Sequence, residues 1–334
     1  MISFALLIII LYSLSLFTSF YKEVYQPFNN EISQKLKGIS CLLIICYHLN
    51  FHVSTPIVAF ASNWGAPVVS IFLFISGYGL MASYLKKGAQ YLKGFLKKRL
   101  WRVCEPLFIV TIIYLTLQYL DRGSFETGQL SGLINKGITP LPFSWFAYSI
   151  IIFYTFFFIS FRWKNLTLPY KILFMSLLAI GYMLIILTTD YERAWWVSSM
   201  AFLSGLIYRY NEQHIITFTH KKWIHFILTP IACGVIYLLV QTKIEILFSI
   251  VYFIIPALIV NLLSFLNWNG GKIFTYLGKI SYEVYLLHGL WIYLLRGQHI
   301  YIGSDYIYIF DIFLLTIISS DLLHRLLNRS QTKL

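Results

Sequence analysis

The sequence predicts an all-α membrane protein, a polytopic transmembrane helix bundle with about 11 spans. Two observations carry this fold class. Hydrophobic residues make up 58% of the 334 residues and charged residues only 12%, whereas a soluble domain is typically about half apolar. The apolar residues also form long continuous runs, not the short alternating segments of a membrane β-barrel.

Eleven runs are apolar enough to be candidate spans. In chain order they are roughly residues 1–20, 38–54, 65–85, 100–120, 143–161, 170–187, 194–210, 223–240, 246–265, 273–295 and 306–323. The run at 194–210 is short for a span. The first run lacks the basic leader and the cleavage site of a secretory signal, so we expect it to be retained. Residues 1–29 are therefore expected to form an additional N-terminal span and linker, ahead of one transmembrane domain over 30–334.

The distribution of Lys and Arg gives the expected orientation. With eleven spans, 21 of the 26 Lys and Arg residues fall on one side of the membrane and 5 on the other. Because Lys and Arg collect on the cytoplasmic side, the N-terminus is expected outside and the C-terminus in the cytoplasm. The net charge of +13 then reflects topology and contact with the lipid bilayer, and we expect no nucleic-acid partner. No pattern in the sequence indicates an oligomeric state.

The cysteines and histidines do not suggest a metal site. Cys41, Cys46, Cys104 and Cys233 all lie in apolar runs, and none has a His or Cys at metal-ligand spacing. We interpret them as small core residues. His48 and His52 are four residues apart and would share a helix face, but no carboxylate in the same helix would complete a metal site.

Lys37 and His48 form the most informative pair. At about 1.5 Å per residue, their positions are roughly 16 Å apart along a helix, which places His48 near the middle of the bilayer. An ionisable group at that depth is costly and is typical of a functional site. Imidazole is a suitable general base near neutral pH. The alternative is a neutral imidazole hydrogen-bonded within the bundle.

The connection over residues 86–102 holds seven basic residues and no acidic one. Arg99 and Arg102 are three apart, so they share a helix face, with Lys98 beside them. Paired guanidinium groups suit phosphate oxygens, and the connection therefore indicates a phosphorylated cytosolic ligand. The alternative is that these cations only set topology and contact anionic lipid. We interpret Glu105 as an ion-pair partner of Arg102.

Two further regions are candidates for contact with a substrate. Glu283 and His288 lie in the tenth run, and we expect both to face the interior of the bundle. The connection over residues 121–142 contains four glycines, which predicts a flexible loop that meets a substrate from outside. A phosphorylated donor inside and a histidine deeper in the membrane would suit group transfer to an acceptor outside.

In these motifs the chain resembles the acyltransferase-3 family, membrane enzymes that acylate sugars, most often with acetyl from acetyl-CoA. The resemblance covers about residues 30–296. The first span of that family has an arginine, ten residues and the histidine regarded as catalytic, where this chain has Lys37, ten residues and His48. Lysine keeps the charge of the family arginine but loses the guanidinium fork.

Four later motifs follow in the family order. They are the aromatic run that ends Ser76-Gly77-Tyr78, the Arg99-x-x-Arg102 pair, the pair Trp145-Phe146, and the pattern from Leu277 to His288.

The resemblance implies a membrane-bound O-acetyltransferase. Acetyl-CoA would bind from the cytoplasm with its phosphates at Lys98, Arg99 and Arg102, and no metal would be required. His48 would take the proton from a hydroxyl of an extracytoplasmic carbohydrate or glycolipid, either in direct transfer or through an acyl-histidine intermediate.

Further candidate roles follow from the same resemblance. Ser76 or Tyr78 would supply an oxyanion donor, and Trp145, Glu283 and His288 are candidate substrate contacts. Lys37 would meet the donor or a buried acid such as Glu105. The abundance of Ile, Lys, Phe, Tyr and Asn indicates a bacterial genome, so we expect the cytoplasmic membrane of a bacterium.

Two other functions fit parts of the same sequence. A transporter or flippase of a polysaccharide or lipid-linked sugar would also have many spans, basic connections and 19% aromatic residues. An inactive family member is the other alternative, because Lys37 replaces the family arginine. Binding of CoA separates the enzyme from the transporter, and the effect of His48→Ala separates it from the inactive member.

Overall fold

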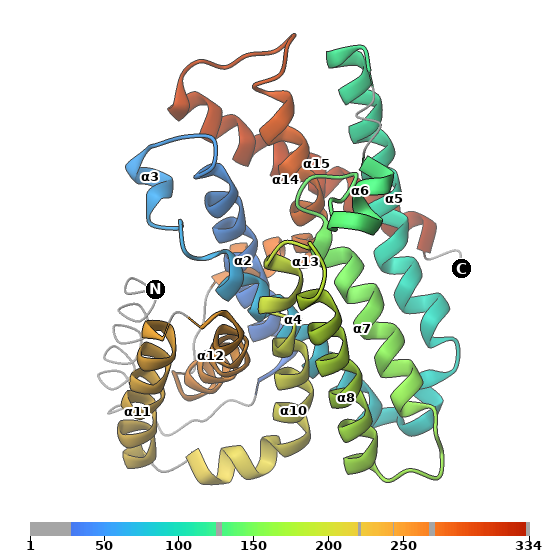
Figure 1. Cartoon of the computed structure of the whole chain (residues 1–334), viewed down its shortest axis with the longest axis vertical. Coiled ribbons are helices and arrows are strands. Elements are labelled where there is room, and N and C mark those ends of the chain that lie inside the picture. Colours follow the sequence, from blue (N-terminus) through green and yellow to red (C-terminus); the bar gives the residue numbers. More distant parts are fainter. Residues whose placement is uncertain (1–27, 125–128, 220–221, 243, 267–270, 332–334) are drawn as a thin grey trace.

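Helices make up most of the described part of the chain, which contains no β-strand (Figure 1). The computed structural model describes residues 28–124, 129–219, 222–242, 244–266 and 271–331. The helices are α2 (Asn30–Leu49), α3 (Pro56–Ala59), α4 (Gly65–Lys87), the 3-10 helix η1 (Gly88–Leu92), α5 (Phe95–Arg122), α6 (Gln129–Lys136), α7 (Trp145–Phe161), α8 (Leu168–Leu187), α9 (Ala194–Val197), α10 (Met200–Thr219), α11 (Lys222–Gln241), α12 (Glu245–Leu266), α13 (Gly271–Lys279), α14 (Ser281–Leu294) and α15 (Asp305–Gln331). The all-α prediction is confirmed.

Local sequence explains where several helices begin and end. The side chain of Asn29 accepts the N–H of Ile32 at 3.0 Å, which satisfies an unpaired amide at the start of α2. Pro56 occupies the first turn of α3, where its missing N–H costs nothing. Helix α5 ends at Gly123, whose left-handed φ of 70° lets its N–H return to the carbonyl of Tyr119.

Two helix pairs touch backbone to backbone through glycines. A Cβ on Gly77 of α4 would overlap the Phe202 carbonyl of α10, and one on Gly205 of α10 would overlap the Phe74 carbonyl of α4. A Cβ on Gly278 of α13 would likewise overlap the backbone of α2. Small residues at helix contacts are typical of membrane bundles, because association there depends on close packing. These contacts fix α2, α4, α10 and α13 as the centre of the bundle.

Five of the described helical segments are long and apolar enough to cross a membrane. They are Gly65–Leu92, Phe95–Arg122, Leu168–Leu187, Glu245–Leu263 and Asp305–Asn328. The helices α5, α7 and α8 stand side by side at one edge of the bundle (Figure 1). The protein is therefore a membrane protein, while the count of eleven spans and the orientation stay predictions. The candidate first span, residues 1–20, and most of the segment 1–29 lie outside the described residues.

The structure divides two runs that the sequence predicts as single spans. The run at 273–295 is two helices, α13 and α14, which meet at Ile280. The Ser281 hydroxyl donates to the Gly278 carbonyl at 2.9 Å, and so takes up a carbonyl at the end of α13. The run at 194–210 is also divided, into α9 and α10, at Ser198 and Ser199, and α10 continues to Thr219.

Two other expectations about secondary structure are wrong. The connection over residues 121–142, predicted as a flexible loop, contains the helix α6. His52, predicted to extend the helix of His48 by one turn, lies in a turn beyond the end of α2 at Leu49.

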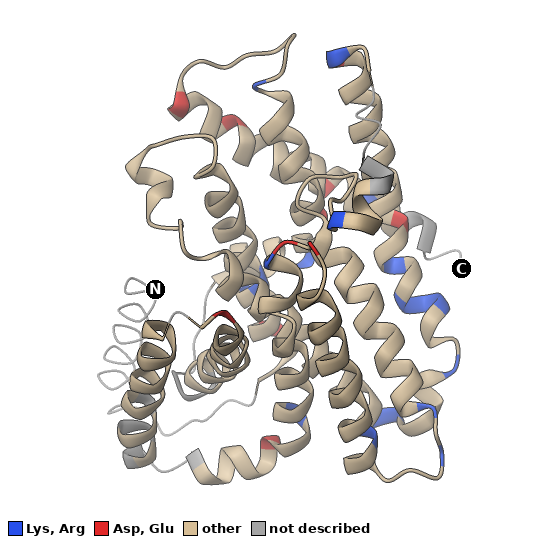
Figure 2. Cartoon of the chain, viewed as in Figure 1, with Lys and Arg blue, Asp and Glu red and all other residues tan. Residues whose placement is uncertain are grey.

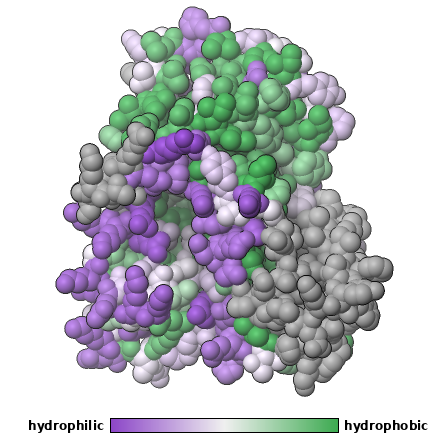
Figure 3. Space-filling model, turned by 180° about the vertical axis from the view of Figure 1, so that it is seen from behind, coloured by the Kyte–Doolittle hydropathy of each residue, from purple (hydrophilic) through white to green (hydrophobic). Residues whose placement is uncertain are grey.

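Charge and hydropathy divide the molecule along its long axis. In Figure 2 the Lys and Arg residues gather at the lower right, where η1 and the start of α5 lie close to the turn between α7 and α8. Seen from behind, the upper part of the molecule is mainly hydrophobic, and hydrophilic residues gather over the lower part around a hollow (Figure 3). The basic end is thus separate from a broad apolar belt.

Candidate active site

Two cavities of different chemistry lie inside the bundle. The larger one, the cationic cavity, has a volume of about 1020 Å³ and is bordered by α2, α4, α5, α7, α10, α13 and α14. Its basic lining residues are Lys37, Lys86, Arg99, Arg102, Arg209 and Lys279. Among the described residues that line it, none is Asp or Glu. The cavity therefore suits a large ligand with several negative charges.

The start of α5 supplies two of these cations. The guanidinium of Arg99 donates to the Tyr91 hydroxyl from Nη2 at 2.6 Å and from Nε at 3.1 Å, which fixes its direction. Arg102 follows one turn later and is exposed. Lys98, the third phosphate ligand expected from the sequence, is exposed and does not line the cavity. Sequence reasoning missed Lys86, Arg209 and Lys279, which come from three other elements.

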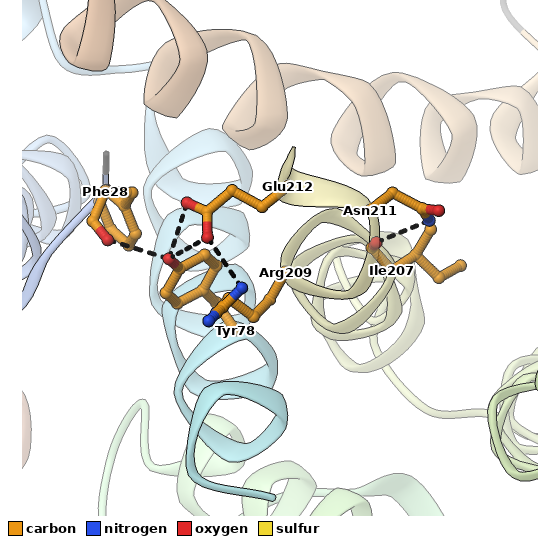
Figure 4. Close-up of polar contacts among 6 residues, drawn as sticks. All are labelled: Phe28, Tyr78, Ile207, Arg209, Asn211 and Glu212. Carbon is orange, nitrogen blue, oxygen red and sulfur yellow. Dashed lines mark hydrogen bonds and ion pairs between the residues drawn. The ribbon is translucent and has the colours of Figure 1, made fainter. Parts of the chain in front are cut away.

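Arg209 lines the cavity from α10 and is held by a buried polar cluster (Figure 4). Its Nη1 lies 3.1 Å from Oε2 of Glu212, which is buried. The Tyr78 hydroxyl lies 2.8 Å and 2.9 Å from the two carboxylate oxygens, and 2.9 Å from the Phe28 carbonyl. Tyr78, a candidate oxyanion donor from the sequence, is therefore committed to this cluster. It lines the cationic cavity, as Ser76 does, and neither residue lines the pocket of His48.

Lys37 reaches the same cavity from α2. The carboxylate that acts on its charge is that of Glu283, not Glu105 as expected. Glu283 is buried, and its Oε1 lies 2.8 Å from Nδ1 of His324 on α15. Glu283 therefore pairs with His324, and it lines neither cavity.

The smaller cavity, the histidine pocket, has a volume of about 410 Å³. His48 lines it, together with seven aromatic residues: Tyr47, Phe51, Phe143, Trp145, Trp195, Tyr285 and Tyr293. Its charged lining residues within the described chain are Glu192 and Arg193, from the turn before α9. Sequence reasoning identified His48 and Trp145 here and missed the others, because aromatic residues are spread along the whole chain.

His48 is paired with His288 across the bundle. Nδ1 of His48 lies 2.8 Å from Nε2 of His288, and both residues are buried. Nδ1 of His288 lies 3.3 Å from the Val284 carbonyl, which can only accept a hydrogen bond. His288 is thus assigned its proton on Nδ1, so its Nε2 accepts from Nδ1–H of His48. This arrangement leaves the lone pair of His48 on Nε2.

The two cavities meet at Tyr285, which lines both of them. Tyr285 is on α14, one turn before His288, and is buried. Its hydroxyl donates to the Phe143 carbonyl and accepts the N–H of Phe146 at 3.1 Å. Phe143 lines the histidine pocket and Phe146 lines the cationic cavity. The segment 143–146 and Tyr285 therefore form the partition between the cavities.

Most of the chain matches a known protein family. The acyltransferase-3 family model, described as an acyltransferase domain, matches residues 35–325. The chain belongs to the acyltransferase-3 family. No curated protein and no solved structure matches the chain. The family match covers every cationic residue of the larger cavity and both histidines of the pair, and it shows a membrane acyltransferase.

In this acyltransferase the residues singled out from the sequence fall into two groups. Lys37, Arg99 and Arg102 line the cationic cavity, and His48 and Trp145 line the histidine pocket. The buried pair His48 and His288 joins residues 240 positions apart, so no local pattern could reveal it. Among the described residues, no three His, Cys, Asp or Glu side chains gather in a group that could hold a metal ion.

Proposed function

We propose that this acyltransferase-3 protein is an O-acetyltransferase. It moves an acetyl group from cytosolic acetyl-CoA to a hydroxyl of an extracytoplasmic carbohydrate or glycolipid, with His48 as general base, in the cytoplasmic membrane of a bacterium. The observation that carries the proposal is the contrast between the two cavities. One is lined by cations and the other holds the histidine pair, and they meet at a single shared residue, Tyr285.

The cationic cavity supports acetyl-CoA as the donor. CoA carries several phosphates, and the cavity offers six Lys and Arg side chains from α2, α4, α5, α10 and α13. Arginine forks pair with phosphate oxygens through two parallel hydrogen bonds. A volume of about 1020 Å³ is at the upper end of the range for small-molecule and cofactor sites. The acyl end of the donor then lies toward Tyr285.

The histidine pocket supports His48 as the base. Nε2 of His48 accepts the proton of the acceptor hydroxyl as its oxygen attacks the thioester carbonyl carbon. The carbon–sulfur bond breaks, and the CoA thiolate takes the proton back from the imidazolium. His288 keeps Nδ1–H of His48 in place throughout, so the lone pair stays on the nitrogen that reacts.

The walls of the histidine pocket support a carbohydrate acceptor. Aromatic rings such as Trp145, Trp195 and Tyr293 offer flat apolar surfaces to the C–H faces of a sugar ring, and Glu192 and Arg193 offer hydrogen bonds to its hydroxyls. A few polar groups among aromatic walls are typical of sites that orient one ligand.

The test is CoA release from acetyl-CoA by purified protein in nanodiscs. Wild type is expected to bind CoA and release it slowly from acetyl-CoA, whereas His48→Ala binds CoA and loses about 10²- to 10⁴-fold in rate, the usual contribution of a general base. His299→Ala is the matched control, because His299 is exposed and lines neither cavity. A wild type that binds no CoA would contradict the proposal and favour a transporter. Unchanged release by His48→Ala would contradict the role of His48.

A further inference from the structure

Phe143 has an unusual backbone conformation. Its φ is 62°, and among the described residues it alone combines a positive φ with a side chain. For a bulky residue this left-handed conformation is strained, and it persists only where the surroundings enforce it. Strained residues of this kind occur often at functional sites. The contacts that hold Phe143 in this conformation therefore point to a role in the site.

Tyr285 and α14 enforce this conformation. The Tyr285 hydroxyl donates to the carbonyl of Phe143 and also accepts the N–H of Phe146. It thereby takes the place of an N-cap for α7, since the Ser144 side chain makes no cap bond there. Gly289 on α14 lets the segment approach closely: a Cβ at that position would lie 3.1 Å from both the Phe143 ring and the Pro142 carbonyl.

The strained backbone places the Phe143 ring flat on the His48 imidazole. The two ring centroids are 3.9 Å apart and the planes meet at 21°. The His288 ring lies beside His48, with its centroid 4.8 Å from that of His48 and 5.7 Å from that of Phe143. The hydrogen bond to His288 opposes rotation of the His48 ring about its Cβ–Cγ bond. The Phe143 ring packs on the face of the same imidazole and adds a second restraint on the orientation of its plane.

We propose that Phe143 is a positioning residue for His48, held in its strained conformation by Tyr285. The inference rests on the proposed function, since it concerns the direction of the Nε2 lone pair during acyl transfer. The Phe143 ring keeps the Nε2 lone pair of His48 pointing in one direction within the histidine pocket. The Tyr285 hydroxyl holds Phe143 in place through its carbonyl, at the partition that the acyl group reaches. A small misplacement of a catalytic group can cost as much as 10²-fold in rate.

The kinetic test compares Phe143→Leu with Phe143→Tyr in the CoA-release assay. Leucine removes the flat ring, and we expect kcat to fall about 10-fold or more with KM for acetyl-CoA unchanged. Tyrosine keeps the ring, so its kcat stays within about twofold of wild type. A Phe143→Leu variant with wild-type kcat would overturn the proposal, as would one whose loss lies entirely in KM.

A second variant reaches the same ring from α14. Gly289→Ala pushes against the Phe143 ring and is expected to lower kcat in the same direction as Phe143→Leu. Gly181→Ala on α8 is the matched control, because a Cβ there meets nothing within 4 Å. Equal kcat in the two alanine variants would count against the proposal, whether or not Phe143→Leu folds.

A readout without turnover separates this inference from the proposed function. In ¹⁵N-histidine solid-state NMR of wild type, the signal absent from His48→Ala is expected to show one neutral tautomer with the proton on Nδ1. In Phe143→Leu the same signal is expected to broaden or split, as the ring gains freedom. An unchanged sharp signal in Phe143→Leu overturns the positioning role even if wild type releases no CoA. A changed signal supports that role even if the acyltransferase proposal fails in the CoA assay.

Discussion

The cationic cavity and the histidine pocket differ in how their walls are made. The cationic cavity gathers Lys and Arg from five helices and has no described acidic lining residue, whereas the histidine pocket has seven aromatic residues and one Glu–Arg pair. A polyanionic ligand is held by many charges spread over a large surface. A proton is moved by one nitrogen that must be aimed. Under the proposed function, affinity for the donor and the rate of transfer would therefore depend on different residues of the protein.

The largest expected effect in this comparison concerns binding of the donor in the cationic cavity. Replacing both Arg99 and Arg102 with Ala removes two forked donors, each worth about 1.5–3 kcal/mol when it meets a charged group. We expect KM for acetyl-CoA to rise about 100-fold or more, with kcat little changed, in steady-state assays. Arg162→Ala is the control, because Arg162 is a basic residue outside the cavity. A fall in kcat with unchanged KM would show that the two arginines act on the chemistry.

The next largest effect concerns the orientation of the base in the histidine pocket. His288→Ala removes the hydrogen bond between the two imidazoles, so the direction of the base is less tightly fixed. We expect kcat to fall about 10- to 100-fold with KM unchanged. His288→Gln should recover part of the rate, since its longer amide places an oxygen near the position of Nε2, where it can accept from Nδ1–H of His48. If the Gln variant is no faster than the Ala variant, the hydrogen bond does not account for the effect.

The features that the sequence could predict depend on residues that are close together along the chain. Helices and candidate spans follow from apolar runs, which are a local property. The different depths of Lys37 and His48 follow from the fixed rise of a helix, and these residues do line different cavities. The family could be identified because several short motifs occur in a fixed order, and the match over residues 35–325 confirms it.

The remainder depends on contacts between distant segments. The pairing of His48 with His288, the bond from Tyr285 to Phe143 and the cluster of Arg209, Glu212 and Tyr78 all follow from helix packing. The break at Ile280 lies next to a close contact with the backbone of α2. Such a contact between distant segments cannot be predicted from the spacing of apolar residues. Tyr78, with Ser76 as the alternative, was expected to donate to the oxyanion, whereas its hydroxyl is bonded to Glu212.

A stability measurement tests the helix contact that packs α4 against α10 beside the cationic cavity. Gly77→Ala forces a Cβ into the Phe202 carbonyl, so α4 and α10 must separate. We expect a loss of about 1–3 kcal/mol in stability, seen as a lower Tm. Gly79→Ala, two residues along the same helix, meets nothing within 4 Å and should leave Tm unchanged or slightly higher. Equal Tm values for the two variants would contradict the close helix contact.

The smallest expected effect concerns the support of Arg209. Glu212→Gln removes the charge that holds the guanidinium, in an ion pair whose arginine side chain is 29% exposed. Such a pair contributes up to about 1 kcal/mol, so KM for acetyl-CoA should rise by at most about fivefold with kcat unchanged. A fall in KM would contradict this role and would mean that the carboxylate opposes binding of the donor.

The most direct test of this division of labour is equilibrium binding of CoA to His48→Ala and to Arg102→Ala, measured beside acetyl transfer in the same nanodiscs. The structure predicts a crossed result. His48→Ala keeps the Kd of wild type for CoA and loses transfer, whereas Arg102→Ala weakens Kd and transfers at the wild-type rate once saturated. Loss of CoA binding in His48→Ala, or loss of transfer at saturation in Arg102→Ala, would contradict it.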